Sequence, residues 1–190
     1  MDLITEFEIN NLNPNHYGYP EWPGGYRWLQ LYDLDSGLQL VVTKGLSDNH
    51  LSRYEIYLET DELLNCNNFS SSWQANLVYE AGKIIPNVPN LEERLNKNKY
   101  LCLQIQIDGA PPEWSINDSN GNIGLFAGLE NDNLSDFNQA FIPLNIKLMR
   151  PEELMYCIQH DRIGRNHLAE LYKEQENSTV SNLYRKSVIN

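Results

Sequence analysis

The stretch Phe141-Ile142-Pro143-Leu144-Asn145-Ile146-Lys147-Leu148-Met149 alternates apolar and polar residues and runs directly into Arg150-Pro151-Glu152-Glu153-Leu154. In a strand, this alternation places Leu144, Ile146 and Leu148 on one side and the asparagine and lysine on the other. A proline suits the first turn of a helix, where its missing N–H has no partner to lose. Two glutamates then lie at the positive end of the helix dipole. The stretch therefore predicts a strand over 143–149 that leads into a helix over 151–160.

Two further helices are predicted on either side of this unit. After Gly164, the run His167-Leu168-Ala169-Glu170-Leu171-Tyr172 predicts a helix over 165–175. Earlier in the chain, a helix is expected over 72–85, where a serine can cap its first turn and Pro86 ends it. Its apolar stripe has helical spacing and consists of Trp73, Leu77, Ala81 and Ile84.

Apolar alternation also predicts strands near 26–34, 38–44, 54–60 and 101–107, with a shorter one over 123–129. In the 54–60 segment, Tyr54, Ile56 and Leu58 are expected to face the core, and Glu55 and Glu59 to face outward. Residues 1–25 carry turn signals instead of a strand pattern.

The order of strands, helix, strands and helices predicts an α+β (mixed α/β) fold, with helices packed on a mixed β-sheet. The length and the lack of a linker indicate a single domain over residues 1–176. Residues 177–190 are rich in asparagine and serine and are expected to form a flexible C-terminal tail.

The chain is acidic, with 26 acidic and 14 basic residues and a net charge of −12. Such a surface repels nucleic-acid phosphates and acidic membranes and favours a basic partner, although charge alone can simply keep a protein soluble. The beginning, Met1-Asp2-Leu3-Ile4-Thr5-Glu6, is acidic where a signal peptide would be basic. Three widely spaced cysteines form no disulfide pattern, so a cytoplasmic location is expected.

No metal or organic cofactor is expected. Cys157, His160 and His167 lack a third Cys or His at useful spacing for zinc, so Cys157 is interpreted as a buried structural thiol on the helix face of Leu154 and Ile158. Residues 118–122 resemble a calcium loop, but their glycine is displaced from the position that an EF-hand requires. A turn is the better interpretation.

The carboxylates of Glu113, Glu130, Asp132 and Asp136 could pair for acid–base catalysis, but they lie in polar, asparagine-rich stretches. A solvated face or a binding rim is favoured there, and Glu130, Asp132 and Asp136 are the candidate partner-binding residues. An N-terminal aromatic group could stack a ligand or plug the edge of the sheet, and packing is favoured. The group consists of Tyr17, Tyr19, Trp22, Tyr26 and Trp28.

Several motifs occur in the order found in the suppressor of fused domain family. They are Gly45-Leu46-Ser47-Asp48 at the end of a strand, the strand Tyr54-Glu55-Ile56-Tyr57-Leu58, Trp73 at the start of a helix, Glu152-Glu153-Leu154 after a strand, and a second helix after Gly164. The chain resembles this family over about residues 26–173. It has Gln74 where the family often has proline, and it has the length of one domain, whereas animal members add a second domain.

The resemblance implies a protein-binding domain without established catalytic residues. Similar stand-alone bacterial members are thought to act as immunity proteins that neutralise a toxin encoded beside them. Together with the charge, this predicts a non-enzymatic partner of a toxin with a basic face. Two alternatives stay open: an enzyme or small-ligand-binding protein that uses the N-terminal aromatic segment and nearby carboxylates, and a structural subunit of a larger assembly.

Overall fold

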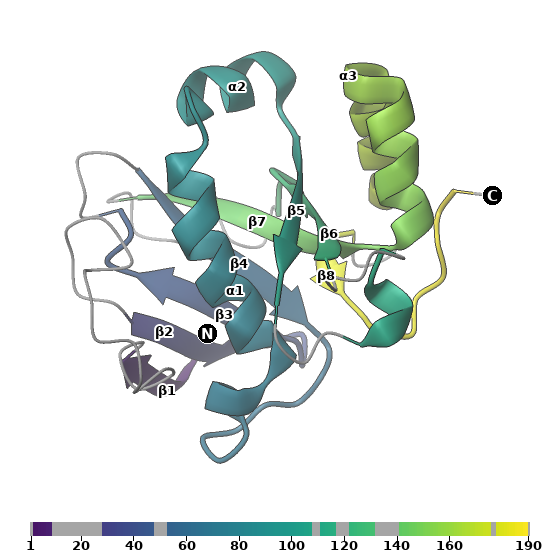
Figure 1. The fold of residues 1–190 in the computed structure, drawn as a ribbon. Coiled ribbons are helices and arrows are strands. Elements are labelled where there is room, and N and C mark those ends of the chain that lie inside the picture. The colour runs from purple at the N-terminus through teal and green to yellow at the C-terminus, as the bar shows by residue number, and fades with distance from the viewer. Residues whose placement is uncertain are drawn as a thin grey trace.

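A computed structural model describes residues 2–8, 28–47, 53–107, 111–116, 122–131, 141–175 and 178–189, with the backbone alone for 2–8. Within these ranges the chain forms a single α+β domain with a mixed sheet, as the sequence predicts. Four strands come first, followed by two helices, three strands, one helix and a short last strand, and the helices pack around the sheet (Figure 1).

The sheet is antiparallel at both sides and parallel in the middle. Its strand order is β1-β2-β3-β4-β7-β6-β5, and β8 also pairs with β4. The parallel pairs are β4 with β7 and β4 with β8, and the other pairs are antiparallel. The strands are β1 (Asp2–Glu8), β2 (Trp28–Asp33), β3 (Gln39–Lys44), β4 (Tyr54–Thr60), β5 (Leu101–Gln106), β6 (Asn122–Ala127), β7 (Ile142–Met149) and β8 (Val180–Ser181).

Six of these strands lie within a residue or two of the predicted segments: β2, β3, β4, β5, β6 and β7. The expectation of turns throughout residues 1–25 is wrong at its start, because β1 pairs with β2 from Asp2 to Glu8. Leu3 and Ile4 are adjacent apolar residues, and a register shift occurs between Leu3 and Thr5. This irregularity breaks the strict alternation by which a strand is recognised.

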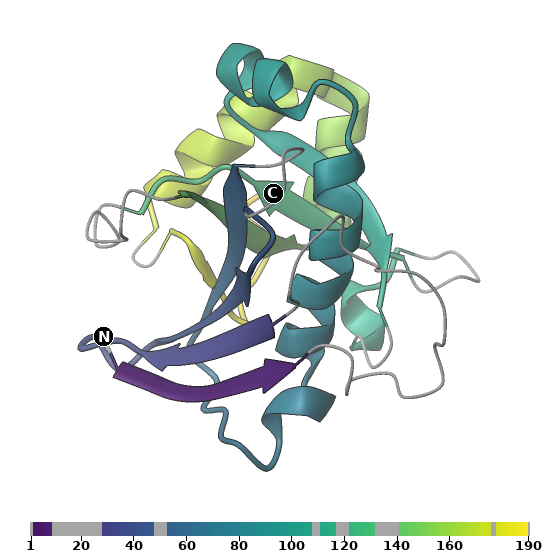
Figure 2. The same ribbon diagram turned by 90° about the vertical axis from the view of Figure 1, so that its left-hand side faces the viewer.

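One face of the sheet is covered by α1 (Trp73–Ile84), which lies across the strands in both ribbon views (Figures 1 and 2). Ser72 caps this helix by accepting a hydrogen bond from the backbone N–H of Ala75, as predicted. Leu77 and Ala81 are fully buried in the larger hydrophobic cluster, whereas Trp73 and Ile84 are half-buried against it. The short helix α2 (Leu91–Asn98) follows and adds Leu91 and Leu95 to the same cluster.

The opposite face of the sheet is also buried, which corrects the expectation that Glu55 and Glu59 face solvent. Both alternate with Tyr54, Ile56 and Leu58 as predicted, yet each is only 3% exposed. The same holds for Asn145 and Lys147 on β7, at 1% each. The alternation of apolar and polar residues correctly identifies the two sides of these strands. It carries no information on whether a second layer of the protein covers the polar side.

That second layer begins with α3 (Pro151–Lys173), which consists of two helical segments. The chain reverses at Asp161, whose φ of 50° and ψ of −126° are not helical. The predicted pair of helices is therefore present, but the break precedes Gly164 by three residues. A Cβ at Gly164 would lie 3.1 Å from the carbonyl oxygen of Tyr156 and 3.3 Å from the Cα of Cys157, so glycine lets the two segments pack closely. In the part of the chain that is described, no helix has the length and apolar character to cross a membrane.

The C-terminal segment completes this layer, contrary to the prediction of a flexible tail. Val180 and Ser181 form β8 alongside Glu59 and Thr60 of β4. Arg185 then pairs with Glu153 at the start of α3. A two-residue strand has too few positions to show a period, so the polar composition of this segment resembles that of a tail.

Candidate functional site

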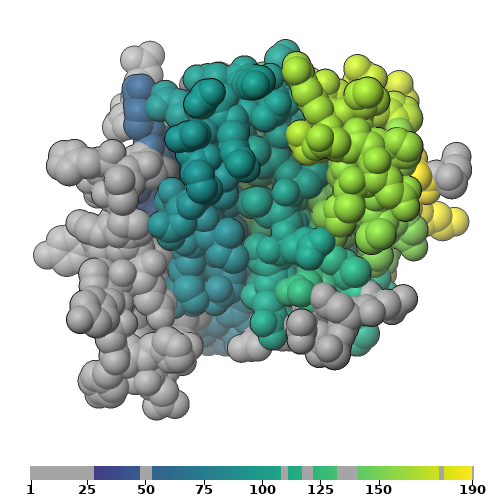
Figure 3. Space-filling model, turned by 45° about the horizontal axis from the view of Figure 1, so that its top comes forward, coloured from purple at the N-terminus to yellow at the C-terminus, as the bar shows by residue number. Residues whose placement is uncertain are grey.

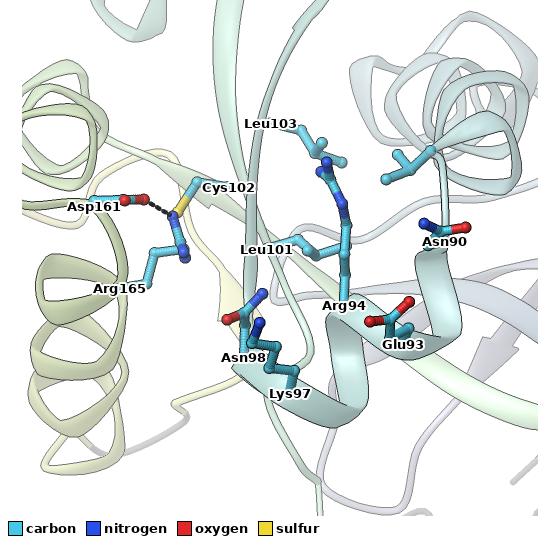
Figure 4. A pocket seen from close by; sticks show the side chains of 11 residues that line it. Asn90, Glu93, Arg94, Lys97, Asn98, Leu101, Cys102, Leu103, Asp161 and Arg165 are labelled. Carbon is cyan, nitrogen blue, oxygen red and sulfur yellow. Dashed lines mark hydrogen bonds and ion pairs between the residues drawn. The ribbon is translucent and has the colours of Figure 1, made fainter.

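A groove of about 420 Å³ lies between α2, β5 and α3. Figure 3 looks onto the face that carries both helices, where the surface is hollowed between them. The side chains that line the groove come from all three elements (Figure 4). They belong to Val88, Asn90, Glu93, Arg94, Lys97, Asn98, Leu101, Cys102, Leu103, Asp161 and Arg165.

The two buried leucines of α2 fix the position of this helix at one side of the groove. With Leu91 and Leu95 in the core, the polar residues between them are directed away from it. The helix ends at Lys99, which has a φ of 62°. Next to this end, Gly128 has a φ of 104°, and a Cβ there would lie 2.5 Å from the carbonyl oxygen of Lys99. Glycine at this position allows the loop after β6 to approach the end of α2 closely.

The groove contains more cations than carboxylates, although the whole chain is acidic. Arg94 and Lys97 project from α2, while Arg165 projects from α3 toward Cys102 (Figure 4). Arg165 also forms an ion pair of 3.0 Å with Asp161, which is exposed at the reversal of α3. The groove can therefore hold a polar or anionic group, but the carboxylates required for acid–base chemistry do not converge in it.

Exposed apolar side chains lie beside the groove at the reversal of α3. Ile158, before the reversal, is 53% exposed, and Ile163, after it, is 78% exposed. Met155 is one turn before Ile158 and is 42% exposed. We call Met155, Ile158 and Ile163 the apolar tip of α3. The prediction that Ile158 shares the buried face of Leu154 and Cys157 is wrong, because that face follows residues 154, 157, 164 and 168.

The tip is held in place by contacts between the two segments of α3. The hydroxyl of Tyr156 and Nδ1 of His167 are hydrogen-bonded at 2.7 Å. The ring of Tyr156 also lies 4.5 Å from that of His160. The first contact joins the two sides of the reversal, and the second lies within the segment before it, so the tip presents its apolar side chains on an ordered support.

The buried carboxylate of Glu55 organises the loop after β3. Its Oε2 accepts a hydrogen bond from Thr43, and its Oε1 accepts bonds from the backbone N–H groups of Gly45 and Ser47 at 3.1 and 2.9 Å. Burial raises the pKa of Glu55, while these hydrogen bonds oppose the rise. The Gly-Leu-Ser part of the family-like motif therefore has a structural role, because its backbone binds this carboxylate.

A second buried group joins the sheet to the C-terminal segment through Glu59 and Lys147. Oε2 of Glu59 accepts hydrogen bonds from the Thr179 hydroxyl at 2.5 Å and from the Asn131 amide at 2.8 Å. The ammonium group of Lys147 donates to the carbonyl oxygen of Val180. Burial, aided by the charge of Arg185, lowers the pKa of Lys147 to about 7. A buried amine of lowered pKa can serve as a nucleophile, but this one is 1% exposed and holds the chain in place.

A third group surrounds Glu153 at the start of α3. Arg185 binds this carboxylate with both terminal nitrogens at 2.6 Å, and Tyr172 donates to it at 2.8 Å. Burial alone would raise the pKa of Glu153, but Arg185 outweighs it, so the pKa lies below its usual value. The guanidinium groups of Arg150 and Arg185 lie 4.0 and 5.3 Å from the ring centre of buried Trp114.

The predicted partner-binding residues are only partly within the described structure. Glu130 is exposed and borders a second pocket of about 500 Å³ near Lys99. Asp132 and Asp136 lie outside the described residues, as do Tyr17, Tyr19, Trp22 and Tyr26 of the aromatic group. Trp28 is half-buried on β2, and Glu113 is exposed. The grouping of the three carboxylates therefore stays a prediction.

The predicted structural thiol is confirmed, because Cys157 is 3% exposed and packs with Leu154. His160 and His167 are exposed beside it. Across the described ranges, no group of three or more His, Cys, Asp or Glu side chains is placed to hold a metal ion.

The groove cations were not identified from the sequence. Arg94 and Lys97 have the spacing of neighbours on a helix, but α2 is short and buries only Leu91 and Leu95, so its sequence carries little helical periodicity. Arg165 is distant from both in sequence, and it reaches the groove only because α3 reverses before it.

Comparisons of this chain with family models, with curated proteins and with solved structures find no match. The resemblance to the suppressor of fused family therefore stays a prediction based on its motifs.

Proposed function

We propose that this chain is a non-catalytic protein-binding domain similar to suppressor of fused, and that it acts as a bacterial immunity protein that neutralises a cognate toxin. The observation that carries this proposal is the apolar tip of α3 beside the groove. An apolar group that stays exposed at the rim of a polar groove is typical of a protein-interaction surface.

The apolar tip would supply most of the binding energy. A few buried anchors usually dominate the affinity of an interface, while the surrounding contacts exclude water. Ile158 and Ile163 lie on an ordered helical support, so their burial against a partner would require little additional ordering. The neighbouring polar groove can fix the orientation of the partner through hydrogen bonds.

The net charge of −12 favours a partner with a basic face. The groove itself does not contribute, because Arg94, Lys97 and Arg165 outnumber Glu93 and Asp161 there. The steering charge would instead come from carboxylates outside the groove, among them Glu130, Asp132 and Asp136. Such steering raises the association rate more than the final affinity. Raising the salt concentration to the physiological level should therefore slow association and change dissociation little.

The structural use of the buried ionisable groups supports a non-catalytic role. Glu55, Glu59 and Glu153 are each hydrogen-bonded to other parts of the fold, and Lys147 is bound to the C-terminal segment. These are the groups whose shifted pKa would otherwise suggest catalysis. The groove could hold a small polar ligand, but among the described residues no pair of carboxylates converges in it to support the alternative of an enzyme.

The direct test is co-expression with the product of the neighbouring gene, followed by affinity purification and a growth assay. We expect the two proteins to co-purify and the chain to restore growth. If they neither co-purify nor restore growth, the immunity function is wrong and the ligand-binding alternative becomes the better one.

The binding surface is tested by the double variant Ile158→Glu/Ile163→Glu. We expect it to bind the partner at least about tenfold more weakly, because each charge would be buried in the interface. Leu63→Glu is the matched control, since Leu63 is 77% exposed but lies between β4 and α1. Unchanged binding of the double variant would exclude the tip as the anchor.

A further inference from the structure

The groove between α2, β5 and α3 gathers positive charge on two of its sides. Of the 14 basic residues of the chain, Arg94 and Lys97 line it from α2 and Arg165 lines it from α3. Among the described residues, the side chains of Arg94 and Lys97 form no hydrogen bond or ion pair. A cleft lined mainly by one sign of charge concentrates ligands of the opposite sign. The groove therefore attracts anions, although the chain as a whole is acidic.

The guanidinium group of Arg165 has a donor left over for such a ligand. Its Nη1 forms the 3.0 Å ion pair with Asp161, but its Nε is buried and has no hydrogen-bond partner among the described residues. A buried donor without a partner costs free energy, which a bound acceptor would recover. The side chain of Asp161 is 87% exposed, so its ion pair contributes little and a ligand of higher charge can replace it.

The groove also offers apolar surface beside these cations. Val88 and Leu103 are only partly buried against the larger hydrophobic cluster, and both line the groove. In Figure 4, Leu101 and Leu103 point to the α2 side of β5, where Arg94 lies. The volume of about 420 Å³ is within the range of small-molecule sites, which combine an apolar lining with a few polar groups.

We infer that the groove binds a small organic phosphate. The phosphate group lies between the two helices, where Arg165 donates hydrogen bonds and Arg94 and Lys97 add positive charge. The apolar body of the ligand covers Val88 and Leu103. A planar carboxylate is satisfied by a single guanidinium group, whereas a tetrahedral phosphate presents oxygens in several directions and carries about two negative charges. Cations from two helices therefore favour phosphate. This inference does not depend on the proposed toxin partner.

The test titrates the full chain with phenyl phosphate, inorganic phosphate, phenylacetate and a phosphoserine peptide, each followed by isothermal titration calorimetry. We expect one phenyl phosphate to bind per chain, at least about tenfold more tightly than inorganic phosphate, which lacks the apolar body, or phenylacetate, which carries a carboxylate. If phenyl phosphate does not saturate a site, or if phenylacetate binds as tightly, the inference is wrong. Binding of the phosphopeptide alone would also overturn it, because the ligand would then be a protein.

Three variants locate the bound phosphate. Arg165→Met should weaken the binding of phenyl phosphate at least about tenfold, whereas Arg162→Met, at an exposed position outside the groove, should leave it unchanged. Asp161→Asn should strengthen binding severalfold, because it removes the carboxylate that competes for Arg165, and asparagine tolerates the positive φ of this position. A gain of affinity cannot result from a loss of folding. Equal affinities in the two arginine variants, or no gain in Asp161→Asn, would exclude Arg165 as the phosphate ligand and overturn the inference.

Discussion

The two faces of the central sheet differ in the chemistry that buries them. On one face, Ile56, Leu58 and their neighbours pack against α1 through apolar contacts. On the other face, Glu59 and Lys147 are covered by the C-terminal segment, which supplies hydrogen-bond partners. Apolar packing tolerates small shifts because it is non-directional. A buried polar layer requires each group to meet its partner, so the loss of one partner affects the whole arrangement.

The largest effect is expected from Glu153→Ala on the polar face. The change leaves the guanidinium group of Arg185 buried without its carboxylate, which typically costs about 3–5 kcal/mol of unfolding free energy. Urea denaturation followed by circular dichroism measures this loss. Glu152→Ala is the matched control, because the adjacent glutamate is exposed and should change stability by no more than about 0.5 kcal/mol. A loss below about 1 kcal/mol for Glu153→Ala would show that the ion pair contributes little.

On the apolar face, Leu77→Ala should cost about 3 kcal/mol through the cavity that it leaves. Leu63→Ala, at an exposed position, should change stability little.

The two faces of the sheet should also differ in how their stability responds to acid. The pKa of Glu153 is lowered in the folded protein, so its contribution is present above about pH 4.5 and is lost as the pH falls through the folded value. The loss caused by Glu153→Ala should shrink in acid, whereas that caused by Leu77→Ala should not.

The apolar face was largely predictable from the sequence, and the polar face was not. Alternation in β4, β5 and β7 and the helical spacing of Leu77 and Ala81 identified the apolar layer, because local periodicity reports which side of an element is apolar. Glu59 and Lys147 have the same periodicity as solvated residues. They are buried because Thr179 and Val180, far away in sequence, supply partners. A contact between such distant positions leaves no local pattern.

The candidate site also depends on contacts between distant positions, which local sequence patterns do not reveal. The buried position of Cys157 follows from its helical neighbour Leu154, but the hydrophobic cluster in which it packs depends on how α3 lies against the sheet. The exposed tip of α3 depends on the reversal at Asp161, where a non-glycine residue adopts a positive φ. The sequence suggested Gly164 as the break, because glycine is the usual residue in such a conformation.

The third prediction concerns the alkaline response of the polar face. The pKa of Lys147 is about 7 in the folded protein and near 10.5 when unfolded. Between these two pKa values the unfolded chain binds more protons than the folded protein does. The unfolding free energy should therefore rise with pH, by about 2 kcal/mol between pH 7 and 9. Thermal and urea denaturation at both pH values measure the rise. Lys147→Met should lose it, and Lys97→Met, on exposed α2, should retain it. An identical rise in Lys147→Met would assign the effect to other groups.

The smallest effect is expected where the C-terminal segment meets β4. Thr179→Val removes the hydroxyl that donates to buried Glu59 but keeps the shape of the side chain. Because Asn131 still donates to the same carboxylate oxygen, we expect a loss of about 1–2 kcal/mol. Thr179→Ser is the matched control, since it retains the hydroxyl and should cost less. If this segment were a flexible tail, neither variant would change stability and both would leave its resistance to proteolysis unaltered. A loss confined to the valine variant, with faster cleavage after α3, would establish that a hydrogen bond holds the end of the chain on the polar face.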